Sequence, residues 1–173
     1  ASGSLRVAAL VSLLGGVHSC TTTNSVNKDC TAITDANLNS AIGMWVGYQA
    51  GAEPMYGHIR DWYTGDVTVM ADVFSSKSTF NDDISGWDTS NVINMNRMFT
   101  GAAAFNQEIG SWSTRNVKTM ASMFEGASNF DGAIGGWNMS VVDTTRNMFK
   151  GASSFDQPIG QWDMSMVKTT EGM

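Results

Sequence analysis

The chain has 173 residues, enough for one domain with a sizeable hydrophobic core. It carries 10 basic and 16 acidic residues, for a net charge of −6 at pH 7, and only 15% of its residues are charged. Nucleic acids are bound by clustered Lys and Arg, whereas the basic residues here are dispersed. The composition therefore argues against a nucleic-acid partner.

Residues 1–19 resemble a targeting segment. Arg6 precedes an apolar run, Val7 to Val17, and small residues lead up to Cys20. This order is typical of a secretory signal that is cut before Cys20. The run is shorter than the roughly 20 residues that span a bilayer, so no full transmembrane span is expected. A second interpretation is that the segment is retained as a short apolar helix, docked on a partner or at a membrane interface.

Residues 20–33 form a polar loop that contains the chain's two cysteines, Cys20 and Cys30. In an exported protein such a pair predicts a disulfide, and the alternative is two free thiols in a flexible linker. A metal site would need further ligands, and His18 and His58 are the only histidines. We expect no metal and no cofactor, and we expect a structural role for His58.

Residues 34–69 are predicted to cap the repeats that follow. Thr34 and Asp35 are suited to capping a helix, and Pro54 forbids its continuation. Apolar residues recur at helical spacing after the predicted cap, at Leu38, Ala41, Ile42 and Trp45. Behind this helix, Ile59 and Trp62 lie 25 residues before Ile84 and Trp87. They indicate a degenerate first coil, as expected for a terminal repeat.

Residues 70–169 repeat one unit four times with a period of 25, and residues 170–173 begin a fifth. Fixed periods of this size mark solenoids. Large apolar residues recur in columns, which we expect to become buried ladders when the coils stack. These columns are Phe80, Phe105, Phe130 and Phe155; Ile84, Ile109, Ile134 and Ile159; and Trp87, Trp112, Trp137 and Trp162.

Each coil is predicted to hold one short strand and one helical turn. We expect the segment from Phe to Trp to be extended in a parallel sheet. The Met-x-x-Met-Phe piece, as in Met95 to Phe99, is expected to form a helical turn or short helix on the other side. The fold class is thus a solenoid of short parallel strands and short helical turns, with an N-terminal helical cap.

Two polar columns accompany the apolar ones. The first comprises Asn81, Asn106, Asp131 and Asp156. We favour a hydrogen-bonded ladder for it over a row that binds cations or sugars. The second comprises Asp88, Ser113, Asn138 and Asp163, whose types are typical of turns. Asn138 also begins the chain's N-glycosylation sequon, which would be used only on a secretory route.

The pattern from Met98 to Met120 resembles the BspA-like surface-protein repeat, and the lead-in from Trp45 to Trp62 is similar to algal members of that family. The resemblance covers about residues 38–173. It implies a right-handed, leucine-rich-repeat-like solenoid with surface, adhesive or protein-binding roles. It implies no catalytic residues.

Two functions follow as hypotheses. The first is a non-catalytic protein-binding or adhesion module of an exported, cell-surface or extracellular protein. The second is a structural subunit of a larger membrane-associated assembly, such as an algal plastid photosynthetic complex, in the lumen or at the membrane. The expected contact regions for partner proteins are the sheet face, the Val7–Val17 segment and an open C-terminal end. No catalytic constellation is apparent, so an enzyme is not expected.

Overall fold

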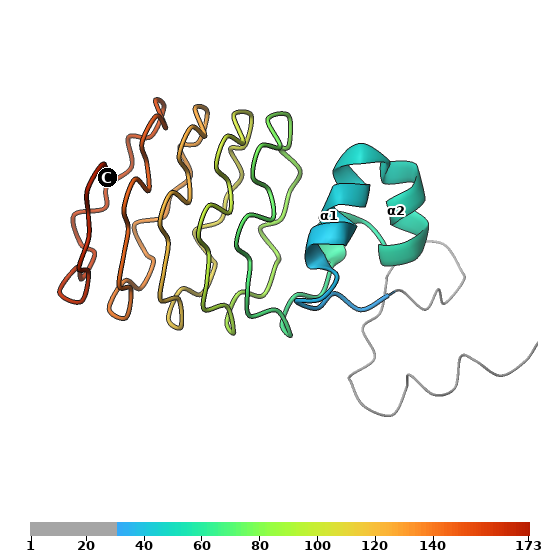
Figure 1. The fold of residues 1–173 in the computed structure, drawn as a ribbon, viewed down its shortest axis with the longest axis horizontal. Coiled ribbons are helices and arrows are strands. Elements are labelled where there is room, and N and C mark those ends of the chain that lie inside the picture. The colour runs from blue at the N-terminus through green and yellow to red at the C-terminus, as the bar shows by residue number, and fades with distance from the viewer. Residues whose placement is uncertain (1–30) are drawn as a thin grey trace, which may run out of the picture.

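The computed structural model describes residues 31–173, so the Val7–Val17 segment and the Cys20–Cys30 pair lie outside the described residues. Two helices, α1 (Leu38–Gly47) and α2 (Gln49–Tyr56), lie at one end, and a 3-10 turn, η1 (Ile59–Asp61), leads into the repeats. From there the chain winds into coils that stand side by side, away from the helices (Figure 1).

Helix α1 buries the face that its spacing predicts, since Leu38, Ala41, Ile42 and Trp45 are all almost fully buried. The predicted cap is wrong. The helix begins after Asn37, which makes no side-chain capping bond. The Asp35 carboxylate instead accepts hydrogen bonds from the main-chain N–H groups of Thr68 and Val69, at 2.8 and 3.0 Å. Asp35 therefore ties the helical cap to the first coil.

The prediction that Pro54 ends the helical region is also wrong, because Pro54 lies inside α2. The chain breaks at Tyr48, where φ is −156° and ψ is 70°, and a second helix starts directly after it. Pro54 is the sixth residue of this eight-residue helix, and Gly57, at φ +77°, ends it three residues later. Proline at this position removes the main-chain donor to the Ala50 carbonyl and its ring crowds that carbonyl, so α2 contains an unfavourable residue close to its end.

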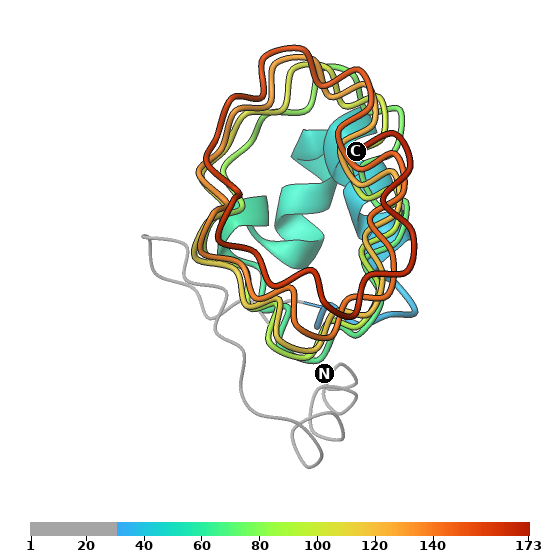
Figure 2. The same ribbon diagram turned by 90° about the vertical axis from the view of Figure 1, so that its left-hand side faces the viewer.

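Main-chain hydrogen bonds join each coil to the next. The N–H groups of Met70, Asp72 and Phe74 donate to carbonyl oxygens 24 residues later, at 2.9 to 3.0 Å, and the same bonds recur in the following coils. One parallel bridge per coil runs along the stack: Val69 to Asn94, Asn94 to Thr119, Thr119 to Thr144 and Thr144 to Thr169. Seen along the stack, the coils overlie one another (Figure 2).

The predicted fold class, a leucine-rich-repeat-like solenoid of parallel strands and helical turns, is wrong. Between residues 31 and 173 there are two short helices and isolated bridges but no strand or sheet. The Met-x-x-Met-Phe piece is a run of turns. Its third residue has positive φ in every coil, at Asp72, Arg97, Ser122 and Asn147. A left-handed residue interrupts both an extended run and a right-handed helix.

The segment from Phe to Trp is bent for a different reason. In the first full coil, main-chain bonds spanning three residues close turns at Phe80, Trp87 and Val92. Such turns recur in the next coils and reverse the chain every few residues. No strand or bridge lies on this side of the coils in residues 70–173, so the sheet face expected as a partner surface is not formed there.

The core consists of stacked rings. Within a coil the two Phe rings lie 3.9–4.1 Å apart between centroids, as in Phe99–Phe105. Between coils, equivalent Phe rings lie 5.3–6.0 Å apart and nearly parallel. The Phe, Ile and Trp columns are buried through Trp137, whereas Phe155 and Ile159 in the last full coil are half-buried.

Each Trp also bonds to the coil before it. The indole N–H groups of Trp87, Trp112, Trp137 and Trp162 donate to the carbonyl oxygens of Ile59, Ile84, Ile109 and Ile134, at 2.9 to 3.3 Å. A buried indole needs such an acceptor. The first of these acceptors, Ile59, belongs to the degenerate coil, so that coil serves the stack as a full one does.

Replacing Ser76 by Gly should stabilise the protein. Ser76 has φ +62°, where the next three coils have Gly101, Gly126 and Gly151. Relief of the left-handed strain, reduced by the entropy cost of Gly, should raise the free energy of unfolding by about 0.5–1 kcal/mol. Chemical denaturation measures the change. Ser75→Gly is the control, where φ is not positive and a loss is expected; equal effects at both sites would contradict the explanation.

Replacing Trp112 by Ala should lower the free energy of unfolding by about 3–5 kcal/mol, because the ring is buried and its N–H bond to Ile84 is lost. Thermal and urea unfolding would measure this loss, with Trp112→Phe as a milder variant. A melting temperature equal to that of the wild type would show that packing of the Trp112 ring does not stabilise the fold.

Candidate functional site

The first polar column forms the predicted ladder. The side-chain Oδ1 atom of each residue accepts a hydrogen bond from the main-chain N–H of the next member of the column. Asn106 donates to Asn81 at 2.8 Å, Asp131 donates to Asn106 at 3.0 Å, and Asp156 donates to Asp131 at 2.9 Å. Two Gln side chains brace it, since Gln107 donates to Asn81 and Gln157 donates to Asp131. We call this column the polar ladder.

The polar ladder engages one side-chain oxygen of each of its first three members in bonds between coils. Each of the first three Oδ1 atoms already accepts a main-chain hydrogen bond from the next coil. In the described part of the chain, no group of three or more His, Cys, Asp or Glu side chains is placed to hold a metal ion. The ladder is thus a joint between coils.

Hydrogen bonding also lowers the pKa of Asp131. The main-chain N–H of Asp156 is the main cause, followed by the Gln157 amide, because both stabilise the charged carboxylate. The pKa of Asp163 is lowered similarly by the hydroxyl and main-chain N–H of Ser165. By lowering the pKa, these hydrogen bonds keep both carboxylates ionised to a lower pH than that of a free aspartate.

Three of the four members of the second polar column form turns through side-chain hydrogen bonds, and within the described residues no such bond is made by the Ser113 side chain. Asp88 and Asp163 accept the main-chain N–H groups of the Ser residues two positions later, at 2.9 and 3.0 Å. Asn138 does the same through its Oδ1 atom, which accepts the N–H and the hydroxyl of Ser140 at 2.9 and 2.7 Å. Asn138 is exposed, so the sequon is placed on the surface.

The line of bridges carries a face of mixed chemistry, which we call the bridge face. It comprises residues 68–69, 93–94, 118–119, 143–144 and 168–169, with the neighbouring Asp72 and Arg97. Arg97 makes two hydrogen bonds to Asp72, at 2.7 and 2.8 Å, and Lys168 pairs with Asp143 at 2.7 Å. Because both pairs are exposed, solvent screens them and they contribute little to stability.

Two apolar side chains are exposed on the bridge face, at its cap end. Val69 is 40% exposed and Ile93 is 46% exposed. The main chains beside them are joined, because the Ile93 N–H donates to the Thr68 carbonyl at 2.8 Å and Val69 bridges Asn94. This end of the face therefore presents apolar area next to threonine and asparagine on a fixed backbone.

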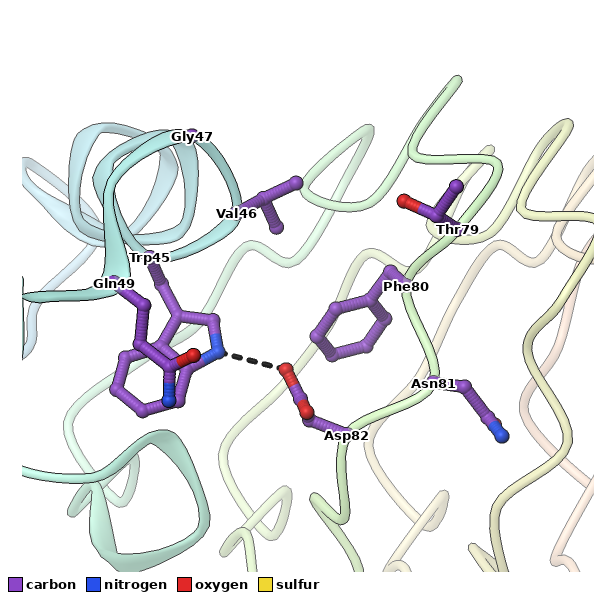
Figure 3. Close-up of a pocket in the computed structure, with 8 residues that line it drawn as sticks. All are labelled: Trp45, Val46, Gly47, Gln49, Thr79, Phe80, Asn81 and Asp82. Atoms are coloured by element: carbon purple, nitrogen blue, oxygen red, sulfur yellow. Dashed lines mark hydrogen bonds between the residues drawn. The ribbon is translucent and has the colours of Figure 1, made fainter.

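A hollow of about 190 Å³ lies where the end of α1 meets the first full coil. Figure 3 shows Trp45, Val46 and Gln49 on the helical side facing Phe80 and Asp82 on the coil side. Gly47, Thr79 and Asn81 complete its walls. The Trp45 indole N–H donates to the Oδ2 atom of Asp82 at 2.7 Å and joins the two sides. We call this space the cap hollow.

The histidine of the cap has structural contacts. The His58 ring lies edge-on to Trp45, with 4.9 Å between ring centroids, and its Nδ1 atom accepts the Arg60 N–H at 3.4 Å.

The cap hollow was not predicted, because it depends on where α1 ends. The only available signal was Asp82, which replaces the neutral Gln or Gly of the later coils at this position.

These features define a repeat protein built of stacked coils. The sequence matches the family described as "Mycoplasma protein of unknown function, DUF285" over residues 23–128 and again over residues 48–162. The protein belongs to this family, since each match covers more than half of the chain. No curated protein and no solved structure matches it. None of the helices between residues 31 and 173 has the length and apolar character needed to cross a membrane.

Replacing Asp131 by Asn should flatten the acid end of the stability curve. A carboxyl whose pKa is lowered from 3.8 stabilises the fold above that pH, and this stability is lost as pH falls through the folded-state pKa. Asn keeps the acceptor but does not titrate. Unfolding curves from pH 7 to about pH 2.5 should therefore fall less steeply for Asp131→Asn than for the wild type.

The matched control is Asp156→Asn, which removes the same charge one coil later. Within the described residues the Asp156 carboxylate accepts no ladder bond. If Asp156→Asn flattened the curve as much as Asp131→Asn, overall charge and not the ladder would explain the pH dependence.

Proposed function

We propose that the protein is a BspA-like, non-catalytic protein-binding or adhesion module of an exported or surface-located protein, and that it contacts its partner through the bridge face. The observation that carries the proposal is the exposure of Val69 and Ile93 on a face whose backbone is tied from coil to coil. Apolar side chains surrounded by polar groups are typical of the centre and rim of an interface.

The rigidity of this face favours binding. Its four bridges, at roughly 4.8 Å per step, extend over about 19 Å, which suits a modest protein interface. Because the main-chain bonds are already made, little conformational entropy is lost when a partner docks. The face carries two paired charges, Asp72 with Arg97 and Asp143 with Lys168, and Lys118 adds one positive charge.

Two further features support the non-catalytic and exported parts of the proposal. His58 is engaged with Trp45 and Arg60 in the cap, and the polar ladder uses its oxygens between coils. The signal-like order of residues around Val7–Val17 and the exposed sequon at Asn138 are consistent with a secretory route.

The test begins with the native source. After mild detergent extraction, the protein is followed by size fractionation and mass spectrometry. An exported module should run outside any large membrane complex, with surface proteins as its co-eluting partners. Migration with a large membrane complex would replace this proposal with a structural-subunit role.

The bridge face is then tested with the partner that fractionation identifies. Ile93→Ser should weaken its binding by about fivefold or more, because an apolar contact at the centre of the interface is lost. Met166→Ser is the control, since Met166 is 53% exposed and lies outside the bridge face. Both variants should unfold like the wild type to within about 0.5 kcal/mol. Equal binding by both variants would exclude the bridge face.

A further inference from the structure

Two main-chain N–H groups of the first full coil lack, within the described residues, the acceptors that their equivalents have in later coils. The N–H groups of Thr79 and Asn81 have no acceptor among residues 31–173. Both residues line the cap hollow. In later coils the N–H groups at these two positions donate toward the preceding coil, so those of Thr79 and Asn81 are directed toward the cap.

The later coils show what fills these donors. At the Thr79 position, the N–H groups of Ala104, Asn129 and Ser154 donate to the carbonyls of Ser78, Ala103 and Ser128, at 3.0 to 3.1 Å. At the Asn81 position, the acceptor is the Asn or Asp Oδ1 atom of the preceding coil, at 2.8 to 3.0 Å. The same pair of acceptors occurs three times.

The two acceptors have a fixed spacing in sequence. In each coil the carbonyl belongs to a Ser or Ala, and the side-chain oxygen belongs to the residue three positions later, as in Ser78 and Asn81. In the helical cap, helix α2 ends at Tyr56, the residue 25 before Asn81. Among residues 31–69, no side-chain oxygen accepts the Asn81 N–H, and Asn81 lines the cap hollow.

The charge in the hollow selects between Asn and Asp. The Oδ2 atom of Asp82 accepts from Trp45, and its Oδ1 atom accepts no hydrogen bond from the described residues. A carboxylate placed here would be repelled by Asp82, whereas a carboxamide can donate to the free Asp82 oxygen. The hollow has a volume of about 190 Å³, enough to admit a polar side chain.

We propose that the cap hollow binds an extended peptide segment of a partner protein with a small residue followed, three positions later, by Asn. The peptide carbonyl accepts from the Thr79 N–H, the Asn side-chain oxygen accepts from the Asn81 N–H, and its NH₂ group donates to Asp82. This inference rests on the proposed function as a protein-binding module. It adds a second contact site and defines the chemistry of its ligand.

The test uses the peptide acetyl-Ser-Ala-Ala-Asn-Gly-amide and NMR of the ¹⁵N-labelled protein. The amide signals of Thr79 and Asn81 and the Trp45 indole signal should shift saturably, whereas those of Ala104 and Asn106 should not. Replacing the peptide Asn by Asp or by Leu should weaken binding by roughly fivefold to tenfold. No saturable shift up to about 10 mM peptide, or equal binding by all three peptides, would overturn the proposal.

A matched pair of protein variants locates the site. No described atom lies within 4 Å of a Cβ built at Gly43 or Gly47, and both residues lie in α1. Only Gly47 lines the hollow. Gly47→Leu should abolish the peptide shifts, and Gly43→Leu should leave them unchanged. Both variants should remain folded, because Leu is a better helix former than Gly. Peptide binding that survives Gly47→Leu would exclude the hollow.

The same variants separate this inference from the proposed function. If the partner found by fractionation binds Gly47→Leu as well as it binds the wild type, and the peptide fails to bind, the protein remains a binding module and the hollow is excluded. If the peptide binds at Thr79 and Asn81 but Ile93→Ser has no effect on the partner, the hollow stands and the bridge face is excluded.

Discussion

A coil of this protein cannot satisfy its own main chain, and the rest of the structure follows from that constraint. The N–H groups of residues such as Met70 and Asp72 find their acceptors 24 residues later. Leaving such groups unpaired in a packed stack would cost about 1–3 kcal/mol each. One residue more or less in a coil would displace all of these bonds together, which explains the constant period of 25.

The aromatic columns depend on that register. When coils repeat at a constant length, each ring stacks on the equivalent ring of the coil before it. The Phe99 and Phe74 rings, for example, have centroids 5.3 Å apart and planes that differ by 1°. Each ring is packed by the equivalent ring of the adjacent coil, so a coil without its neighbour would leave its rings without this contact. The indole hydrogen bonds, such as that from the Trp112 N–H to the Ile84 carbonyl, also fix the position of each coil relative to the one before it.

Periodicity reveals some of this structure and conceals the rest. The buried columns and the polar ladder can be predicted, because each is written several times at one spacing. The turns cannot, because Asp72, Arg97, Ser122 and Asn147 share positive φ but no side-chain chemistry. The expected strands and helical turns came from apolar spacing, which does not register such residues. The cap hollow depends on features that occur once, the end of α1 and the bond from Trp45 to Asp82.

The uniform junctions between coils have a consequence for how such proteins change over generations. Duplication or loss of the coding sequence for one whole repeat joins surfaces that already fit, so the gene can lengthen or shorten in complete units. Such an event changes the reach of the bridge face while leaving α1, α2 and the hydrogen bonds from Thr68 and Val69 to Asp35 untouched. Surface length and the chemistry of the capped end are therefore free to evolve separately.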